Sequence, residues 1–447
     1  MKISKYTFLF HVDDTEFYIY NTLSNSLIEI DKDSYYFLKK AQAEQTNINP
    51  SEIDYEIYNV LVTKKIITEN DIDSFLLYKS NLTTQRAGKS HMHLTIAPTM
   101  DCCFNCPYCF EKYKTPNYMS EETMDAIIKY LNSLESKPKL KLTWFGGEPL
   151  MASSQMEQFY KKLTTRYKKP VISNVITTGF HINENIINIL QRINVEQVQI
   201  TLDGLKDTHN NIKFTTGCTD SFNKVVDNIE LLLKTSDIHV VFRVNLTKQN
   251  AHEYVHLYNY LTKRFKDYRK KGVSPAFVMD RGACNVSNKE KGTFFNPSEA
   301  AQFILELHHK YGIHSPFLKY PSSFFLECAI KNIMSISFDP EGNAYKCWEL
   351  IGNKEYAIGK LNREGKLDNI NETILNRHLY GADPLEDPTC SACEYLPVCN
   401  GGCPIQRLEN MFDNKNNCYC TFYKGYMEEF LKVHLMLKKA GFENKDL

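Results

Sequence analysis

The chain has 447 residues, with 43% hydrophobic residues, 24% charged residues and a formal net charge of zero. This length predicts several domains, since one domain takes roughly 100–200 residues, and the zero net charge gives no reason to expect a nucleic-acid partner. No apolar run approaches the roughly 20 residues of a membrane span and no secretory signal is evident, so we expect a cytoplasmic protein with no membrane partner.

Residues 1–88 contain no cysteine and predict a separate module. Three short β-prone runs come first, followed by two segments with helical periodicity. These five segments are Tyr6–Val12, Phe17–Tyr20, Leu27–Ile30, Ser34–Ala43 and Ser51–Thr63. Ser51 is expected to cap the second helix, and the polar stretch Ile72–Ser90 is expected to be a linker. The order predicts a winged-helix-like module.

Strands and helices alternate from His93 to about Asp280. Helices such as Ser120–Leu134 separate largely apolar strand candidates. The strand candidates are Leu94–Ala97, Leu140–Phe145, Val171–Thr177, Val195–Thr201 and Val240–Leu246. Buried strands alternating with helices predict a parallel sheet of βαβ units, with its active site at the C-terminal strand ends. We assign this domain to residues 89–315.

Regular periodicity fades over about Ser323–Tyr423, where cysteine, glycine, proline and asparagine are frequent. Such a segment is expected to fold around bound metal rather than on hydrophobic burial alone. A helix is predicted at Phe422–Lys439, and we assign this last domain to residues 316–447.

The strongest motif is Cys102-x3-Cys106-x2-Cys109, directly after the first predicted strand of the sheet. Clustered cysteines in a cytosolic chain indicate metal or redox chemistry rather than disulfides. Three thiolates on one loop can hold three irons of a 4Fe–4S cubane and leave the fourth iron open for the amino and carboxylate groups of S-adenosylmethionine (SAM). A zinc site is the alternative, although structural zinc normally takes four protein ligands. Cys103 lies within this loop, and we assign it no role.

This cysteine loop resembles the signature of the radical SAM superfamily. Gly146-Gly147-Glu148-Pro149 is similar to the family's motif for the SAM amino group, and its glycines are expected to let backbone carbonyls approach the ligand. Thr177-Thr178-Gly179 and Thr201-Leu202-Asp203-Gly204 resemble strand-end positions near SAM, and Arg243 and Asn245 are candidates for its carboxylate. Helix caps and turns are the alternative for the two threonine-containing motifs. The resemblance thus implies SAM contacts from Gly146, Gly147, Glu148, Pro149, Thr178, Thr201, Asp203 and Arg243.

The resemblance also implies the fold and the chemistry. The expected fold is α/β, a partial (β/α)6 TIM-type barrel with the N-terminal module and a C-terminal domain organised by iron–sulfur clusters. An external donor such as flavodoxin or ferredoxin is expected to supply an electron for the cleavage of SAM. Cleavage gives a 5′-deoxyadenosyl radical that abstracts a hydrogen atom.

The C-terminal cysteines resemble the SPASM extension of this family. Their pattern is Cys328-x13-Gly342-x4-Cys347, then Cys390-x2-Cys393-x5-Cys399-x3-Cys403, then Cys418 or Cys420. SPASM implies two auxiliary 4Fe–4S clusters, and so three clusters in all. By analogy, one is held by Cys390, Cys393, Cys399 and the final cysteine, and the other by Cys328, Cys347 and Cys403.

Two ligand assignments in this extension stay open. Cys418 and Cys420 compete for the final position, and we favour Cys420 because we expect it at the start of the C-terminal helix, where the dipole stabilises a thiolate. The cluster at Cys328 has no evident fourth ligand, so it is expected to keep an open iron or to take the spare cysteine. A zinc ribbon is the alternative for Cys390–Cys403.

The N-terminal module resembles the leader-peptide recognition domain of enzymes that modify ribosomally made peptides. Such a module would bind the leader as an added β-strand. We therefore predict a maturase that cross-links a precursor peptide through a thioether, with a carbon–carbon or carbon–oxygen bond as the variants. One alternative is an anaerobic sulfatase-maturing enzyme that makes formylglycine. The other is a non-catalytic, metal-dependent peptide-binding scaffold.

Overall fold

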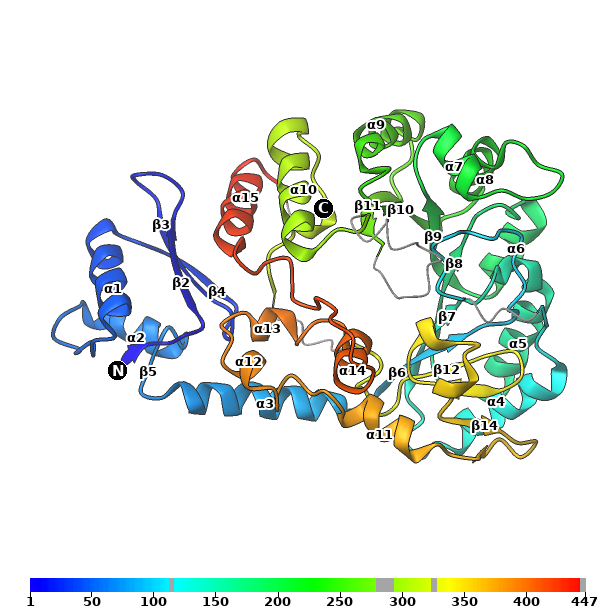
Figure 1. Ribbon diagram of the computed structural model, residues 1–447, viewed down its shortest axis with the longest axis horizontal. Coiled ribbons are helices and arrows are strands. Elements are labelled where there is room, and N and C mark those ends of the chain that lie inside the picture. The colour runs from blue at the N-terminus through cyan, green and yellow to red at the C-terminus, as the bar shows by residue number, and fades with distance from the viewer. Residues whose placement is uncertain (112–115, 279–292, 323–327, 443–447) are drawn as a thin grey trace. The chain divides into compact units, whose positions relative to one another are not determined.

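The computed structural model describes residues 1–111, 116–278, 293–322 and 328–442, which divide into two compact units (Figure 1). Unit 1 comprises Met1–Ala87, Asn296–Cys328 and Tyr380–Leu447, and unit 2 comprises Gly88–Phe295 and Ala329–Leu379. Each unit therefore combines segments that are distant in the sequence. The three consecutive domains expected from the sequence stay a prediction.

Unit 2 is built on a parallel sheet with strand order β11-β10-β9-β8-β7-β6. The strands are β6 (His91–Ile96), β7 (Lys139–Trp144), β8 (Val171–Thr177), β9 (Val195–Leu202), β10 (His239–Leu246) and β11 (Lys271–Phe277). Alternation of helices with strands confirms the α/β class, and the sheet stays open because β6 and β11 do not pair in the described residues.

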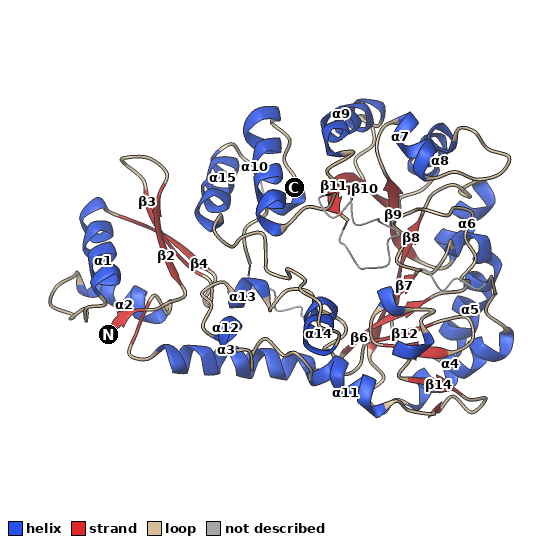
Figure 2. Ribbon diagram, viewed as in Figure 1, coloured by secondary structure: helices blue, strands red, loops and turns tan. Residues whose placement is uncertain are grey.

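Helices follow the strands of unit 2 and line the outside of the curved sheet (Figure 2). They are α4 (Glu121–Ser133), α5 (Ser153–Arg166), α6 (Glu184–Arg192), α7 (Lys206–Ile212), α8 (Ser221–Thr235) and α9 (Tyr254–Arg264), with short 3-10 turns η1 (Pro149–Ala152) and η2 (Ala251–Glu253). Helix α4 shows why they pack there: Met124, Ile127 and Leu131 recur on one buried face behind an N-cap at Ser120.

The sheet of unit 2 continues into a segment where the sequence analysis predicted no strands. Strand β12 (Ile336–Phe338) pairs parallel to β6, and β13 (Asn343–Tyr345), β14 (Gly359–Leu361) and β15 (Leu367–Asp368) follow antiparallel. Turns η5 (Trp348–Leu350) and η6 (Lys354–Tyr356) and helix α11 (Glu372–Tyr380) complete this part. These strands have two or three residues each, too few for a periodic signal.

Unit 1 contains an antiparallel sheet of β2 (Thr7–His11), β3 (Phe17–Asn21) and β4 (Ser26–Ile30), and a small pair of β1 (Lys2–Ile3) with β5 (Ile67–Thr68). Its helices are α1 (Lys32–Glu44), α2 (Tyr55–Thr63), α3 (Asp71–Arg86), α10 (Pro297–Tyr311), α12 (Pro388–Ser391), α13 (Leu396–Cys399), α14 (Pro404–Phe412) and α15 (Met427–Lys439), with the turn η4 (Pro316–Leu318). The order of three strands followed by helices is the predicted one, and the separate winged-helix-like module stays a prediction.

Three boundary predictions in unit 1 were wrong. Helix α2 begins at Tyr55, because the Asp54 carboxylate, and not Ser51, accepts hydrogen bonds from the first N–H groups. The stretch expected to be a linker is the helix α3, whose buried side chains are Ser74, Tyr78 and Leu82. The last helix begins at Met427, five residues later than predicted.

The N-terminal sheet shares its core with the C-terminal segments of unit 1. One face, with Phe17 and Ile19, packs on α1. From the other face, Phe8 packs on Tyr395, with 5.2 Å between ring centroids, and the Tyr20 hydroxyl donates to the Pro321 carbonyl at 2.5 Å. Strand β3 is therefore buried on both sides. In the part of the chain that the structure describes, we find no helix that could span a membrane.

Candidate functional site

The three cysteines of the first motif lie on one loop at the C-terminal end of β6 in unit 2. All three are half-buried, and the N–H of Cys109 donates to the carbonyl of Cys106 at 3.1 Å, which closes the loop. The N–H of Cys102 donates to the Asp101 carboxylate at 2.9 Å. Burial raises the pKa of the Cys106 thiol to about 11, and the nearby Lys213 ammonium acts in the opposite direction.

The glycine motif after β7 packs directly on this cysteine loop. The N–H of Gly147 donates to the Thr99 carbonyl at 3.1 Å, and the N–H of Glu148 donates to the Asp101 carbonyl at 2.8 Å. A Cβ at Gly147 would lie 2.1 Å from the Asp101 carbonyl oxygen, and a Cβ at Gly146, where φ is +112°, would lie 2.5 Å from that of Thr99. The glycines are therefore required for the close contact between the two loops.

Glu148 is fully buried and joins the ends of β7 and β8. One carboxylate oxygen accepts hydrogen bonds from the Thr177 hydroxyl at 2.6 Å and the Leu150 N–H at 3.0 Å. The other accepts from the N–H and hydroxyl of Thr178 at 2.8 and 2.6 Å. A carboxylate offers about four lone-pair sites, so the protein itself occupies those of Glu148. The predicted SAM contacts of Glu148, Pro149 and Thr178 stay predictions.

Asp203, directly after β9, is fully buried in a network with the cysteine loop. The Tyr108 hydroxyl donates to one of its carboxylate oxygens, and the Lys213 ammonium pairs with the other. The Asn245 amide also donates to the Tyr108 hydroxyl, at 3.1 Å. Burial alone would lower the pKa of Lys213, but Asp203 and Cys106 outweigh it and raise the pKa. A buried cation therefore lies beside the cysteine loop.

Two further predicted residues lie side by side on neighbouring strands. Thr201 on β9 is in register with Arg243 on β10. The Arg243 side chain is exposed, and its Nε donates to the Asn245 side-chain carbonyl at 3.1 Å. A hydroxyl, a guanidinium and an amide thus gather near the strand ends, and their contacts with SAM stay predictions.

A stack of three aromatic rings in unit 2 connects two cysteine segments. Phe110, next to Cys109, stacks on Phe145 at a centroid distance of 6.1 Å and an interplanar angle of 11°. Phe145 in turn stacks on Trp348 at 5.6 Å and 26°, and Trp348 directly follows Cys347. The segments that carry Cys109 and Cys347 are therefore packed together.

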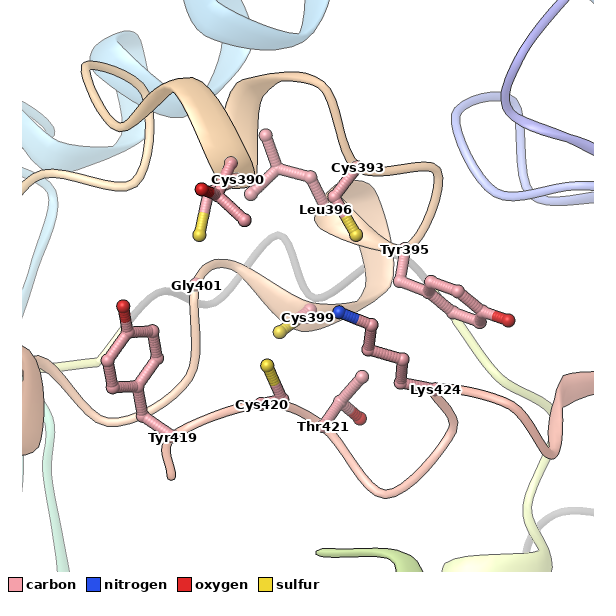
Figure 3. Close-up of a pocket in the computed structure, with 11 residues that line it drawn as sticks. Cys390, Cys393, Tyr395, Leu396, Cys399, Gly401, Tyr419, Cys420, Thr421 and Lys424 are labelled. Atoms are coloured by element: carbon pink, nitrogen blue, oxygen red, sulfur yellow. The ribbon is translucent and has the colours of Figure 1, made fainter. Parts of the chain in front are cut away.

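Four cysteines of the C-terminal group line one pocket in unit 1, as Figure 3 shows: Cys390, Cys393, Cys399 and Cys420. The cavity measures about 40 Å³, more than the roughly 10–15 Å³ that one water molecule needs. Burial raises the pKa of Cys399 to about 11 and also raises the pKa values of Cys390 and Cys393. Cys420 thus joins the other three, although its expected position at a helix start was wrong.

The remaining C-terminal cysteines do not line this pocket. Cys418 is exposed, and Cys403 stands at the N-cap of α14. Cys328 belongs to unit 1 and Cys347 to unit 2, so the cluster predicted at Cys328, Cys347 and Cys403 stays a prediction. Over the described ranges, no three Cys, His, Asp or Glu side chains are arranged to hold a single metal ion.

The sequence analysis missed three residues of these sites: Tyr108, Lys213 and Arg407, whose guanidinium contacts Cys390. Tyr108 could have been noticed from its place between Cys106 and Cys109. Nothing in one sequence marks Lys213 or Arg407 as buried.

Comparison with known proteins identifies the domain that carries the first site. Residues 96–261 match the family model of the radical SAM superfamily. The cysteine-type anaerobic sulfatase-maturating enzyme of Clostridium novyi is 22% identical in an alignment of 368 residues that covers 76% of this chain and 95% of that protein.

Two solved structures have similar folds. Native anSMEcpe with bound AdoMet and Cp18Cys peptide aligns with a TM-score of 0.57 and 19% identity, covering 78% of this chain and 98% of that one. Streptococcus suis SuiB bound to S-adenosylmethionine aligns with a TM-score of 0.51 and 14% identity, covering 94% of this chain and 99% of that one.

Residues 96–261 are therefore a radical SAM domain, and the protein is an enzyme. This domain implies SAM and a 4Fe–4S cluster as cofactors. The donor set fits, because three half-buried cysteines on one loop could hold three irons and would leave the fourth for SAM.

Proposed function

We propose that the protein is a maturase that cross-links a precursor peptide. The observation that carries the proposal is the composition of unit 1, in which a pocket of four cysteines shares a core with an N-terminal sheet. A radical SAM domain needs neither feature to cleave SAM. Their presence in one unit supports a division of labour in which the N-terminal sheet binds the peptide and the clusters support its oxidation.

In this proposal Cys102, Cys106 and Cys109 hold the cluster that binds SAM. With SAM bound, this cluster supplies the 5′-deoxyadenosyl radical, using an electron from flavodoxin or ferredoxin. The protein's part is to hold the cysteine loop in place, through the glycine contacts and the Asp203–Lys213 pair, and to exclude water from the reacting atoms. Gly146, Gly147, Glu148, Pro149, Thr178, Thr201, Asp203 and Arg243 complete the SAM site.

We assign two auxiliary clusters to the remaining cysteines. Cys390, Cys393, Cys399 and Cys420 hold one, which their shared pocket supports. As the resemblance to the SPASM extension implies, Cys328, Cys347 and Cys403 would hold the other and would leave one iron for a substrate thiolate. Closing a thioether removes two hydrogen atoms from the peptide: one is abstracted by the radical, and the other leaves as a proton and an electron, which a bound auxiliary cluster would accept.

The leader of the precursor is proposed to pair with the edge strand β4. Of the two edges of this sheet, β2 packs beside α15, whereas the side chains of β4 are half-buried or exposed. An edge strand offers unpaired N–H and C=O groups to an extended peptide. A peptide substrate is also supported by the anSMEcpe structure, which contains the Cp18Cys peptide.

Sulfatase maturation is the second candidate, because the Clostridium novyi relative has that activity in its name and is covered over 95% of its length. It would convert a cysteine or serine of a sulfatase to formylglycine. A carbon–carbon or carbon–oxygen cross-link is a variant of the first proposal.

The test is co-expression of the full-length protein with short peptides encoded beside its gene, followed by mass spectrometry and an assay for 5′-deoxyadenosine. A cross-link appears as the loss of two hydrogens with all sulfur retained. Formylglycine made from a cysteine of a sulfatase peptide appears as loss of that sulfur. SAM cleavage without either product would contradict both candidates.

A further inference from the structure

Arg407 on α14 is a buried arginine whose guanidinium is fixed by three partners. Its exposed fraction is 4%, and one terminal nitrogen lies 3.1 Å from the sulfur of Cys390. The other terminal nitrogen donates to the Asp387 carboxylate at 2.8 Å, and Nε donates to the Ala382 carbonyl at 2.7 Å. The planar group therefore has one orientation, with an N–H directed at the cysteine.

The partners explain why a charge is tolerated there. A buried cation is costly unless it is paired and hydrogen-bonded. Asp387 supplies one negative charge, and its carboxylate is itself held by the N–H groups of Thr389 and Cys390. The ion pair of Arg407 and Asp387 therefore supports the segment that carries Cys390. An N–H aimed at the sulfur favours a thiolate over a thiol, because only the thiolate is a strong acceptor.

Arg407 also touches the second ligand segment of the pocket. Its guanidinium carbon lies 4.7 Å from the centre of the Tyr419 ring, and Tyr419 precedes Cys420. A cation over an aromatic face is attracted to it. One side chain thus connects the segments of Cys390 and Cys420, which are thirty residues apart in the sequence.

We propose that Arg407 is a positioning residue that holds the Cys390 thiolate and raises the reduction potential of the cluster bound in this pocket. The inference rests on the auxiliary cluster proposed above. Hydrogen bonds to ligand sulfurs are among the factors that set the potential of an iron–sulfur cluster, since they stabilise its more negative, reduced state. Lys424 lines the same pocket and supplies a positive charge there, but within the described residues it makes no hydrogen bond to a thiol, so Lys424 serves as the control residue.

The test is a potentiometric titration followed by electron paramagnetic resonance, on the full chain with Cys102, Cys106 and Cys109 replaced by alanine. The signal measured is the one that disappears in Cys420→Ala. Arg407→Gln should lower the midpoint potential, Arg407→Lys should lower it less, and Lys424→Gln should change it least. If Arg407→Gln keeps the iron content of the parent and its midpoint potential is unchanged, the role of Arg407 is overturned. The proposed auxiliary cluster would not be affected by that result.

A second measurement needs no substitution at Arg407. In the same protein labelled with ¹⁵N-arginine, pulsed electron paramagnetic resonance should detect a hyperfine coupling between an arginine ¹⁵N nucleus and the reduced cluster. Absence of that coupling would overturn the hydrogen bond even if Arg407→Gln fails to fold. Zinc without iron in this pocket of the unlabelled protein would overturn both the auxiliary cluster and the inference.

Discussion

Thr178 gives both its backbone N–H and its hydroxyl to the same carboxylate oxygen of Glu148, at 2.8 and 2.6 Å. This pairing fixes the end of β8 against the loop that touches the cysteines. Glu148→Gln keeps the shape but places an amide where two acceptor oxygens are needed, so we expect a loss of about 2–4 kcal/mol in unfolding free energy and weaker SAM binding. Denaturant titration and equilibrium dialysis measure the two effects.

The control for Glu148 is Glu157→Gln. Glu157 forms an exposed ion pair with Arg192 on the surface of the same unit, and such pairs contribute about 0–1 kcal/mol. If the two substitutions lower the unfolding free energy equally, the proposal that Glu148 holds the ends of two strands together is contradicted.

Cys418 and Cys420 should differ in iron content. Cys420 lines the pocket with three other cysteines, whereas Cys418 does not. We expect Cys420→Ala to lose roughly four of about twelve irons per chain and Cys418→Ala to stay near the parent value. Iron and sulfide analysis after anaerobic reconstitution checks this. If each substitution removes a different cluster, both auxiliary sites are closed by protein and direct binding of a substrate thiolate is excluded.

The effects on stability of substitutions at Lys213 and Asp203, which form a buried ion pair, should be coupled. Lys213→Met leaves the Asp203 carboxylate buried without its cation, and we expect a loss of about 3–5 kcal/mol. Adding Asp203→Asn to that variant removes the unpaired negative charge and should recover part of the lost unfolding free energy, which denaturant titration can measure. Lys270→Met, which breaks an exposed pair with Asp237, is the control. No recovery in the double variant would contradict the coupling.

Strand β4 allows the leader-binding proposal to be tested with two neighbouring substitutions. N–H groups of successive residues point to opposite sides of a strand, and proline has no N–H. Of the two variants Ile28→Pro and Glu29→Pro, one therefore removes an N–H that is bonded to β3. The other removes an N–H that points to the outer edge of the sheet. We expect the variant that keeps its melting temperature to lose binding of a fluorescent leader peptide. Unchanged binding in that variant would refute pairing at β4.

His209 predicts how stability depends on pH. Burial lowers the pKa of this histidine from 6.5 to about 3, and both of its ring nitrogens lack a partner in the described residues. The unfolded chain therefore binds a proton below pH 6.5 that the folded chain does not, and stability falls as the pH falls from about 6.5 toward 3. The slope from one such group approaches about 1.4 kcal/mol per pH unit.

His209→Phe should remove this part of the slope, because phenylalanine keeps the contact with Phe222 and does not titrate. Denaturant titrations at pH 7, 6 and 5 measure it. A parallel pH dependence of His209→Phe and the parent would contradict the assignment.

Segments rich in β-branched residues made parts of the fold predictable. Val171–Thr177 is predicted and observed with the same bounds, since five of its seven residues are valine, isoleucine or threonine, which favour a strand. The sixth strand, Lys271–Phe277, was missed because its sequence contains glycine and proline. The helix α3 was missed because it buries only a narrow stripe and is otherwise polar.

Some residues of the candidate sites could likewise be predicted from the sequence, and others could not. Spacing within one loop identified Cys102, Cys106 and Cys109, because neighbours in sequence stay neighbours in space. Contacts made across the chain left no mark in the sequence: Lys213 reaches the loop of Cys106 from more than a hundred residues away. The pairing of α3 with the C-terminal segments, through Tyr78 and Asn400, is equally long in range.

The aromatic stack also gives the protein an optical reporter. The chain has two tryptophans, and they differ sharply in exposure: Trp144 is fully buried beside the glycine motif, whereas Trp348 is 40% exposed at the end of the stack. Emission from a buried indole lies at shorter wavelength than emission from a hydrated one, so the two contributions are separable. Iron–sulfur clusters absorb in the region of indole emission and quench it by energy transfer. Assembly of the cluster proposed at Cys109 is therefore expected to appear in real time as a loss of tryptophan fluorescence, without any added label.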